Sequence, residues 1–113
     1  MKGNGYNTSI FPGNEDGTCL ICKRVGDTAR HEIFHGPNRQ ISKRLGAWIS
    51  VCPACHAKIH AGDNTEYRWL KEAAQRLLEI EMGHWGYMAW IGRNYLEEYE
   101  WIEIPLRAPK SGL

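Results

Sequence analysis

Residues 19–60 have the sequence CLICKRVGDTARHEIFHGPNRQISKRLGAWISVCPACHAKIH, which contains all four cysteines and four of the five histidines of the chain. The cysteines form two CxxC pairs, Cys19 with Cys22 and Cys52 with Cys55. Zinc prefers four tetrahedral ligands, and two thiolates on one tight turn can supply half of that shell. The spacing therefore predicts one structural Zn²⁺ site made by all four cysteines.

Two other uses of the cysteines are open. A redox dithiol needs only one CxxC pair, usually at a helix start within a βαβ pattern that this sequence lacks. Two thiol pairs that bind no metal are the other alternative. Zinc is favoured because a small chain with a short hairpin gains stability from a metal that joins distant segments.

The stretch between the cysteine pairs predicts two strands and a connection. Residues 28–34 and 46–51 are rich in β-branched and aromatic side chains, as strands are. The connection, residues 35–45, contains Gly, Pro and Asn and is expected to be a loop. Pro53 fits the first turn of a helix that extends to about His60.

A second helix is expected after this segment. Asp63 and Glu66 have the spacing of a capping box, and Gly83 is expected to end the helix. A short third helix is expected over residues 87–91. The second helix has apolar residues at helical spacing, which predict a core stripe in preference to a partner groove: Leu70, Ala73, Ala74, Leu77 and Leu78.

Length and charge limit the class of protein. With 113 residues we expect one α+β domain. Fourteen Lys and Arg against thirteen Asp and Glu exclude a basic nucleic-acid tail and an acidic disordered segment. Residues 1–60 carry a net charge of +4 and residues 61–113 one of −3, so a phosphate-binding surface is expected in the first half. The domain is expected to divide into a flexible lead-in (1–17), a zinc-binding core (18–62), a helical support (63–96) and a C-terminal tail (97–113).

No apolar run approaches the roughly 18–20 residues that span a bilayer. Residues 1–17 also lack an apolar stretch of signal-peptide length. We therefore expect a cytoplasmic protein with no membrane partner. In that reducing compartment, paired cysteines indicate metal or redox chemistry in preference to structural disulfides.

Three histidines can form a second metal site. His56 and His60 are four residues apart on one predicted helix, so they share a face. If the strands form a hairpin and the helix packs across it, His31 can face both. Three protein ligands with open positions are what a hydrolytic metal site requires. The alternative is that these are ordinary surface or core histidines; His84 lies outside the group and is expected at a helix end.

Three stretches together resemble the phage-type branch of the HNH endonucleases, whose fold is called ββα-metal: CLIC at 19–22, RHEIFHGPNR at 30–39 and LGAWISVCPACHAKIH at 45–60. The stretch WGYMAWIGRNYL at 85–96 resembles the tail of phage members of that branch. The resemblance covers roughly residues 19–96. It implies a small, zinc-stabilised, treble-clef-like hairpin plus helix, which the longer packing helix and the short C-terminal helix expected above then follow.

The resemblance assigns roles by motif spacing. His31, His56 and His60 match the ligands of a catalytic divalent metal, which could be Mg²⁺, Mn²⁺ or Zn²⁺. Glu32 occupies the position of the general base, which is usually a histidine in the family. An ordinary Glu has a pKa of about 4.3 and is a weaker base than imidazole. His35 shares a side of the strand with His31 and is the alternative base.

One family residue is replaced. The Asn that gives the family its middle letter should lie nine residues before His56, where this chain has Ala47. Other contacts must therefore orient the hairpin. Asn38 lies in the connection and is not assigned that role.

Basic residues between the strands predict contacts with DNA. Arg39, Lys43 and Arg44 lie on the connection, with no acidic residue between Glu32 and Asp63 to offset them. Such residues grip phosphates without reading sequence, so weak specificity is expected. Arg30 and Lys58 are expected to extend this surface; the alternative is a solvated loop.

The sequence as a whole predicts a metal-dependent DNA endonuclease of the HNH type, from a phage or prophage in a bacterial host. The alternative is a zinc-stabilised treble-clef module that binds DNA or a protein partner without cutting. Ala47 and Glu32 favour this alternative, because they replace two of the residues that name the family. No particular oligomeric state is predicted.

Overall fold

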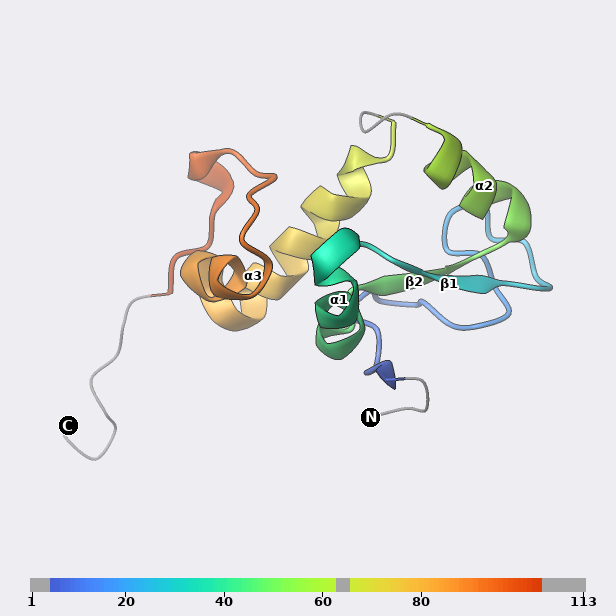
Figure 1. Cartoon of the computed structure of the whole chain (residues 1–113), viewed down its shortest axis with the longest axis horizontal. Coiled ribbons are helices and arrows are strands. Elements are labelled where there is room, and N and C mark those ends of the chain that lie inside the picture. The colour runs from blue at the N-terminus through green and yellow to red at the C-terminus, as the bar shows by residue number, and fades with distance from the viewer. Residues whose placement is uncertain (1–4, 63–65, 105–113) are drawn as a thin grey trace.

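The structure is a computed structural model that describes residues 5–62 and 66–104 (Figure 1). It confirms an α+β fold in which a two-stranded hairpin is followed by helices. No helix in the described ranges is both long and apolar enough to cross a membrane. The elements in chain order are β1 (Ala29–Glu32), η2 (Gly36–Asn38), α1 (Arg39–Leu45), β2 (Trp48–Val51), α2 (Pro53–Ala61), α3 (Arg68–Ile91) and η3 (Glu98–Glu100).

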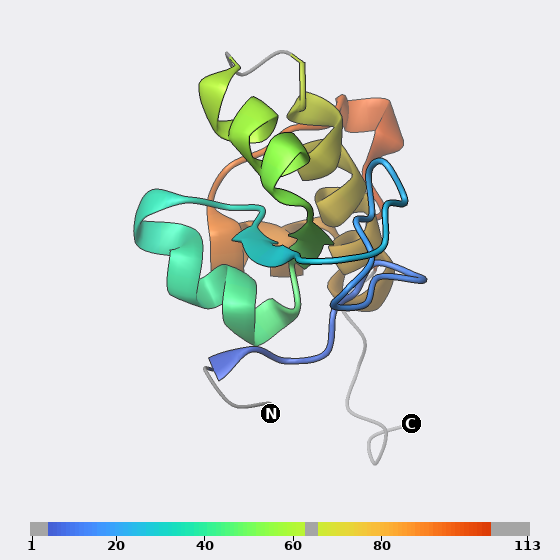
Figure 2. The ribbon, with the colours of Figure 1, turned by 90° about the vertical axis from the view of Figure 1, so that its right-hand side faces the viewer.

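The antiparallel hairpin has two chemically different faces. His31 pairs with Ile49, and Glu32 pairs with Trp48. Because successive side chains point to opposite faces of a strand, His31 and Glu32 face opposite ways. Helix α2 lies on the face of His31, and residues 5–17 lie on the face of Glu32 (Figure 2).

The prediction of a loop over residues 35–45 is wrong, because these residues form the 3-10 turn η2 and the helix α1. After Pro37, the sequence RQISKRL has good helix formers, and its Ile41 and Leu45 pack against the core. Helix α1 ends at Gly46, which has a φ of 77°. A Cβ atom at this position would lie 2.2 Å from the carbonyl oxygen of Thr8, so only glycine fits.

Helix α2 begins as predicted. Pro53 occupies its first position, and Cys52 is the N-cap, whose Sγ accepts a hydrogen bond from the backbone N–H of Cys55 at 3.4 Å. The sulfur therefore caps the helix while it faces the other cysteines. This local structure fixes the direction of the helix that carries His56 and His60.

Helix α3 supplies much of the core. Leu70, Ala74 and Leu78 are buried, which confirms the apolar stripe. The helix begins at Arg68, later than the predicted capping box, whose Asp63 lies outside the described residues. Gly83 interrupts the helical geometry with a φ of 74° and a ψ of 169°, so the predicted stop is a kink, and the helical turns continue to Ile91.

The described part of the predicted flexible lead-in is packed against the hairpin. Tyr6 and Phe11 are buried. The Ser9 hydroxyl donates to the Trp48 carbonyl at 2.8 Å, and the Ser50 N–H donates to the Asn14 side chain at 2.8 Å. A two-stranded hairpin leaves one face open, and these residues cover it.

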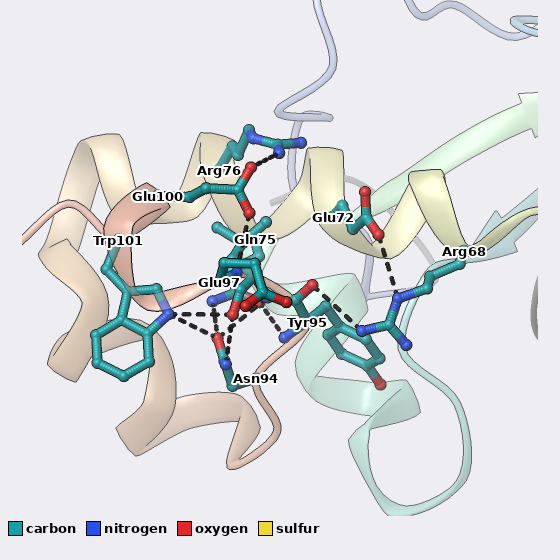
Figure 3. Close-up of polar contacts among 10 residues, drawn as sticks. Arg68, Glu72, Gln75, Arg76, Asn94, Tyr95, Glu97, Glu100 and Trp101 are labelled. Atoms are coloured by element: carbon teal, nitrogen blue, oxygen red, sulfur yellow. Dashed lines mark hydrogen bonds and ion pairs between the residues drawn. The ribbon is translucent and has the colours of Figure 1, made fainter.

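Residues 94–102 pack across the kink of α3. The Gln75 amide donates to Asn94 at 2.8 Å, and the Trp101 indole donates to the same side chain at 3.1 Å (Figure 3). His84, expected at a helix end, is fully buried. It bonds Glu79 at 2.7 Å and stacks on Trp101 with ring centroids 3.6 Å apart. The sequence analysis did not find this polar cluster, because the packing of residues 94–102 against α3 is a tertiary contact that no motif marks.

Candidate metal centres

The four cysteines lie together. Their Sγ atoms are all within 4.8 Å of one another, and the Sγ atoms of Cys22 and Cys52 are 3.7 Å apart. A tetrahedral zinc with Zn–S bonds of about 2.3 Å separates its sulfurs by about 3.8 Å. The cluster therefore fits a structural Zn²⁺ and joins the segment before β1 to the first turn of α2. We call Cys19, Cys22, Cys52 and Cys55 the four-cysteine cluster.

Backbone groups favour thiolates in this cluster. Burial alone would raise the pKa of Cys19, but backbone N–H groups, led by that of Cys22, lower it to about 6. The N–H of Cys55 likewise lowers the pKa of Cys52. Burial and the neighbouring sulfurs raise the pKa of Cys55 to about 12. Anionic and neutral sulfurs held this close suit a cation that binds all four as thiolates.

Three histidines form a second cluster beside the first. The ring nitrogens of His31, His56 and His60 lie within 4.8 Å of one another. The Nε2 atoms of His56 and His60 are 3.0 Å apart. Two imidazoles on one metal, with bonds of about 2.0–2.1 Å, place their nitrogens about 2.9–3.4 Å apart. This three-histidine cluster therefore fits a divalent metal ion.

The three-histidine cluster is graded from core to solvent. His31 is buried on β1, His56 is half-buried on α2, and His60 is exposed one turn later. Burial, followed by the charges of His35 and His56, lowers the pKa of His31 to about 3. Near pH 7 the His31 ring is therefore neutral, which is the form that binds metals.

His35, one of the two candidate bases, lies beside this cluster although it is beyond the end of β1. Its ring centroid is 5.0 Å from that of His31 and 6.0 Å from that of His60. Burial and the nearby charge of Lys71 lower the pKa of His35 below its ordinary value. Its imidazole is therefore neutral near pH 7 and can accept a proton.

Glu32, the other candidate base, is buried and engaged on the opposite face of β1. One carboxylate oxygen accepts a hydrogen bond from Arg39 Nε at 2.9 Å, and the other accepts one from the Tyr6 hydroxyl. Burial and the bond to Glu32 raise the pKa of Tyr6 to about 12. Both oxygens of Glu32 are thus held by donors.

A hollow of about 210 Å³ opens beside the three-histidine cluster. Of the five basic residues assigned to DNA, Arg30 and Arg39 line it. Its other lining residues are His31, Glu32, His35, Gly36, His56 and His60.

The other three basic residues have different surroundings. The Lys43 ammonium lies over the Tyr6 ring, 4.8 Å from its centroid. Arg44 lines a separate hollow that also contains Glu81, and Lys58 is exposed on α2. Arg30, although it borders the histidine hollow, is paired with Asp16. The structure therefore brings Arg39 to the histidines but not Arg44.

Ser42 is the contact that orients the hairpin end near Ala47, and the sequence analysis missed it. Its hydroxyl accepts a bond from the Phe34 N–H and donates one to the Phe34 carbonyl, both at 2.9 Å. The Ala47 carbonyl accepts from the Ile33 N–H at 2.9 Å. Asn38 instead donates to the Ile91 carbonyl at 2.9 Å, which ties η2 to the end of α3. A serine inside a basic stretch carries no pattern that would have marked it.

Comparisons with protein-family models, curated proteins and solved structures found no match to this chain. What the site can bind is therefore inferred from its own geometry. The chain has a four-cysteine cluster, buried except at Cys22, that fits structural zinc, and a three-histidine cluster, exposed at His60, that fits a divalent ion.

Proposed function

We propose that the protein is a metal-dependent DNA endonuclease of the HNH type. The observation that carries the proposal is the convergence of His31, His56 and His60 on one point, from a strand and a helix, next to an open hollow. A structural histidine group would not need an exposed member or a hollow beside it. Three protein ligands with open positions are the arrangement of hydrolytic metal sites.

The residues of the site would have three roles: metal binding, proton acceptance and phosphate binding. A divalent cation held by the three imidazoles would supply charge stabilisation for the scissile phosphate and its leaving oxygen. His35 would accept a proton from the attacking water, because its ring is neutral and borders the hollow. Glu32 would hold Arg39 against the hollow, where the guanidinium can bind a phosphate oxygen.

The proposed substrate is a DNA phosphodiester, recognised with weak sequence specificity, in a phage or prophage setting. The resemblance of residues 19–96 to HNH endonucleases supports DNA, and the position of Arg39 beside the histidine hollow is consistent with a contact to its backbone. The four-cysteine cluster would keep its Zn²⁺ as a structural ion, because all four of its ligands are protein sulfurs.

Plasmid cleavage tests the proposal. The purified protein is dialysed against a chelator, and Mg²⁺, Mn²⁺ or Zn²⁺ is returned before supercoiled plasmid is added. We expect cleavage to stop on chelation and to return with at least one ion. His56→Ala should abolish it while melting and zinc content stay near wild type, and Gln40→Ala, on the exposed side of α1, should cleave normally. Wild-type cleavage by both His56→Ala and His60→Ala would contradict the proposal.

A second function is favoured by one specific observation. Glu32, at the base position, accepts one hydrogen bond on each oxygen, from Tyr6 and from Arg39, which weakens it as a base. A zinc-stabilised module that binds DNA or a protein without cutting would tolerate this arrangement. Metal-dependent DNA binding without cleavage under any ion would identify that module.

A further inference from the structure

We propose that a basic hollow on the α3 side of the molecule binds the DNA backbone next to the scissile position. This inference rests on the proposed function and extends it. The hollow has a volume of about 310 Å³ and is bordered by three basic side chains, Arg68, Lys71 and Arg93. All three lie after residue 60, in the half of the chain for which the sequence predicted no phosphate-binding surface.

The hollow lies next to the three-histidine cluster, and the neighbouring recesses share lining residues. His35 borders both this hollow and the one beside the three-histidine cluster. A narrower recess between them is lined by His31, His35 and Lys71. A polyanion bound at the histidines can therefore extend past His35 toward the three basic residues. No acidic side chain lines the basic hollow or the recess, and Glu32, which lines the histidine hollow, is paired with Arg39.

The basic groups in the hollow lack full compensation. Arg68 is paired with Glu72 at 3.1 Å and donates to the Tyr95 carbonyl at 3.3 Å, so its guanidinium is fixed at the rim (Figure 3). Within residues 5–62 and 66–104, neither Lys71 nor Arg93 forms an ion pair with an acidic residue. Lys71 is half-buried, and Arg68 and Arg93 line the same hollow. Like charges around one hollow favour an anion between them.

The rest of the lining suits a nucleotide chain better than a small anion. Pro37 and Tyr95 add apolar surface to the charged rim, and the buried Phe34 ring lies beneath them. The rings of Phe34 and Tyr95 are 6.0 Å apart and inclined by 33°. Successive phosphates need several cations in a row, while sugars and bases need apolar contact, and this hollow offers both.

The test compares two charge-matched double variants in DNA binding. Lys71→Gln/Arg93→Gln removes two positive charges from the hollow. Lys23→Gln/Arg24→Gln removes two from the first CxxC turn, where both side chains are exposed. Zinc-loaded protein is titrated into a fluorescein-labelled duplex of arbitrary sequence over a range of NaCl concentrations, and anisotropy gives the affinity at each.

We expect the hollow variant to bind about 10- to 100-fold more weakly at ~0.1 M salt, with a log–log salt slope reduced by about 1.8 for two lost phosphate contacts. The Lys23/Arg24 variant should keep the wild-type slope. Both should retain zinc and melt like wild type. If the double variant fails to fold, Arg93→Gln alone, on an exposed residue, should reduce the slope by about 0.9.

An equal slope in the hollow variant and the wild type, or no binding of duplex by the wild type, would overturn the inference. Plasmid cleavage by the wild type separates the two proposals. If the wild type cleaves plasmid and the hollow variant keeps the wild-type salt slope, the proposed nuclease activity is retained and the proposed DNA-binding role of the hollow is rejected. A reduced slope without cleavage under any ion would keep the hollow and favour the non-cutting module.

Discussion

Helix α2 contributes residues to both candidate metal-binding clusters, but the clusters differ in the number of ligands and in their exposure to solvent. The four-cysteine cluster uses the first turn of α2 and closes around its centre with four sulfurs, three of them on buried residues. The three-histidine cluster uses the next turns of α2, offers three nitrogens, and ends at an exposed residue beside a hollow. A closed shell suits a structural ion, and an incomplete shell beside a hollow suits chemistry.

This difference shows how a small chain can separate stability from activity. Cys55 and His56 are consecutive on α2, so the helix directs one side chain to the four-cysteine cluster and the next to the three-histidine cluster. The cysteines determine where α2 lies, and the histidines depend on that placement. Loss of the four-cysteine cluster should therefore destroy both sites, whereas loss of a histidine should destroy one.

The largest effect is expected from Cys52→Ser or Cys22→Ser. Structural zinc contributes about 10–16 kcal/mol of binding free energy in zinc-finger peptides, which equals or exceeds the usual stability of a domain. Either variant should lose zinc and unfold or aggregate, as followed by metal analysis and circular dichroism. A metal-free protein that melts cooperatively at the wild-type temperature would contradict a structural zinc at the four-cysteine cluster.

The next effect separates the two candidate bases. His35→Ala should lower the rate of plasmid cleavage by about 10²- to 10⁴-fold, because it removes the proton acceptor beside the metal centre. Glu32→Gln should act mainly on DNA affinity, since it weakens the hold on Arg39. Single-turnover rates at saturating protein distinguish the two. Full activity in His35→Ala with a large loss in Glu32→Gln would make Glu32 the base.

The sequence was most informative where spacing alone determines geometry. The cysteine pairs, His56 with His60 on one helix and the position of Pro53 all follow from local periodicity, and the clusters formed as predicted. The sequence was least informative about contacts between distant segments that no motif links. The engagement of Glu32 by Tyr6, the burial of His84 under Trp101 and the basic hollow depend on tertiary packing. The residues Gly36, Pro37 and Asn38 before Arg39 also led to the prediction of a loop where the helix α1 forms.

A smaller effect is expected from Ser42→Ala. The buried hydroxyl bonds both polar backbone groups of Phe34, so its removal leaves them unpaired and should cost about 1–3 kcal/mol. The melting temperature should fall by several degrees, with zinc retained, in calorimetry beside Gln40→Ala as the exposed α1 control. An unchanged melting temperature would mean that other contacts hold the end of the hairpin.

The smallest effect concerns α1. Arg39 borders the three-histidine cluster and Arg44 does not, so Arg39→Gln should reduce the salt slope of DNA binding by about 0.9, whereas Arg44→Gln should leave it unchanged. Arg44→Gln should leave the melting temperature near wild type, because exposed charges contribute little. Arg39→Gln should lower it, because the buried Glu32 carboxylate then loses its cationic partner. Equal reductions would extend the DNA surface along the whole helix, and no reduction in either would place that surface elsewhere.

The central claim is that the four-cysteine cluster is a closed structural site and the three-histidine cluster an open reactive one. Graded chelation tests it most directly, with zinc content, circular dichroism and plasmid cleavage measured on the same samples. The account predicts two separate stages. Mild chelation should abolish cleavage while one zinc per chain and the fold remain, and added divalent metal should restore cleavage; only harsher chelation should remove that zinc and unfold the protein. Cleavage that persists until the last zinc leaves, and is lost together with the fold, would contradict the account.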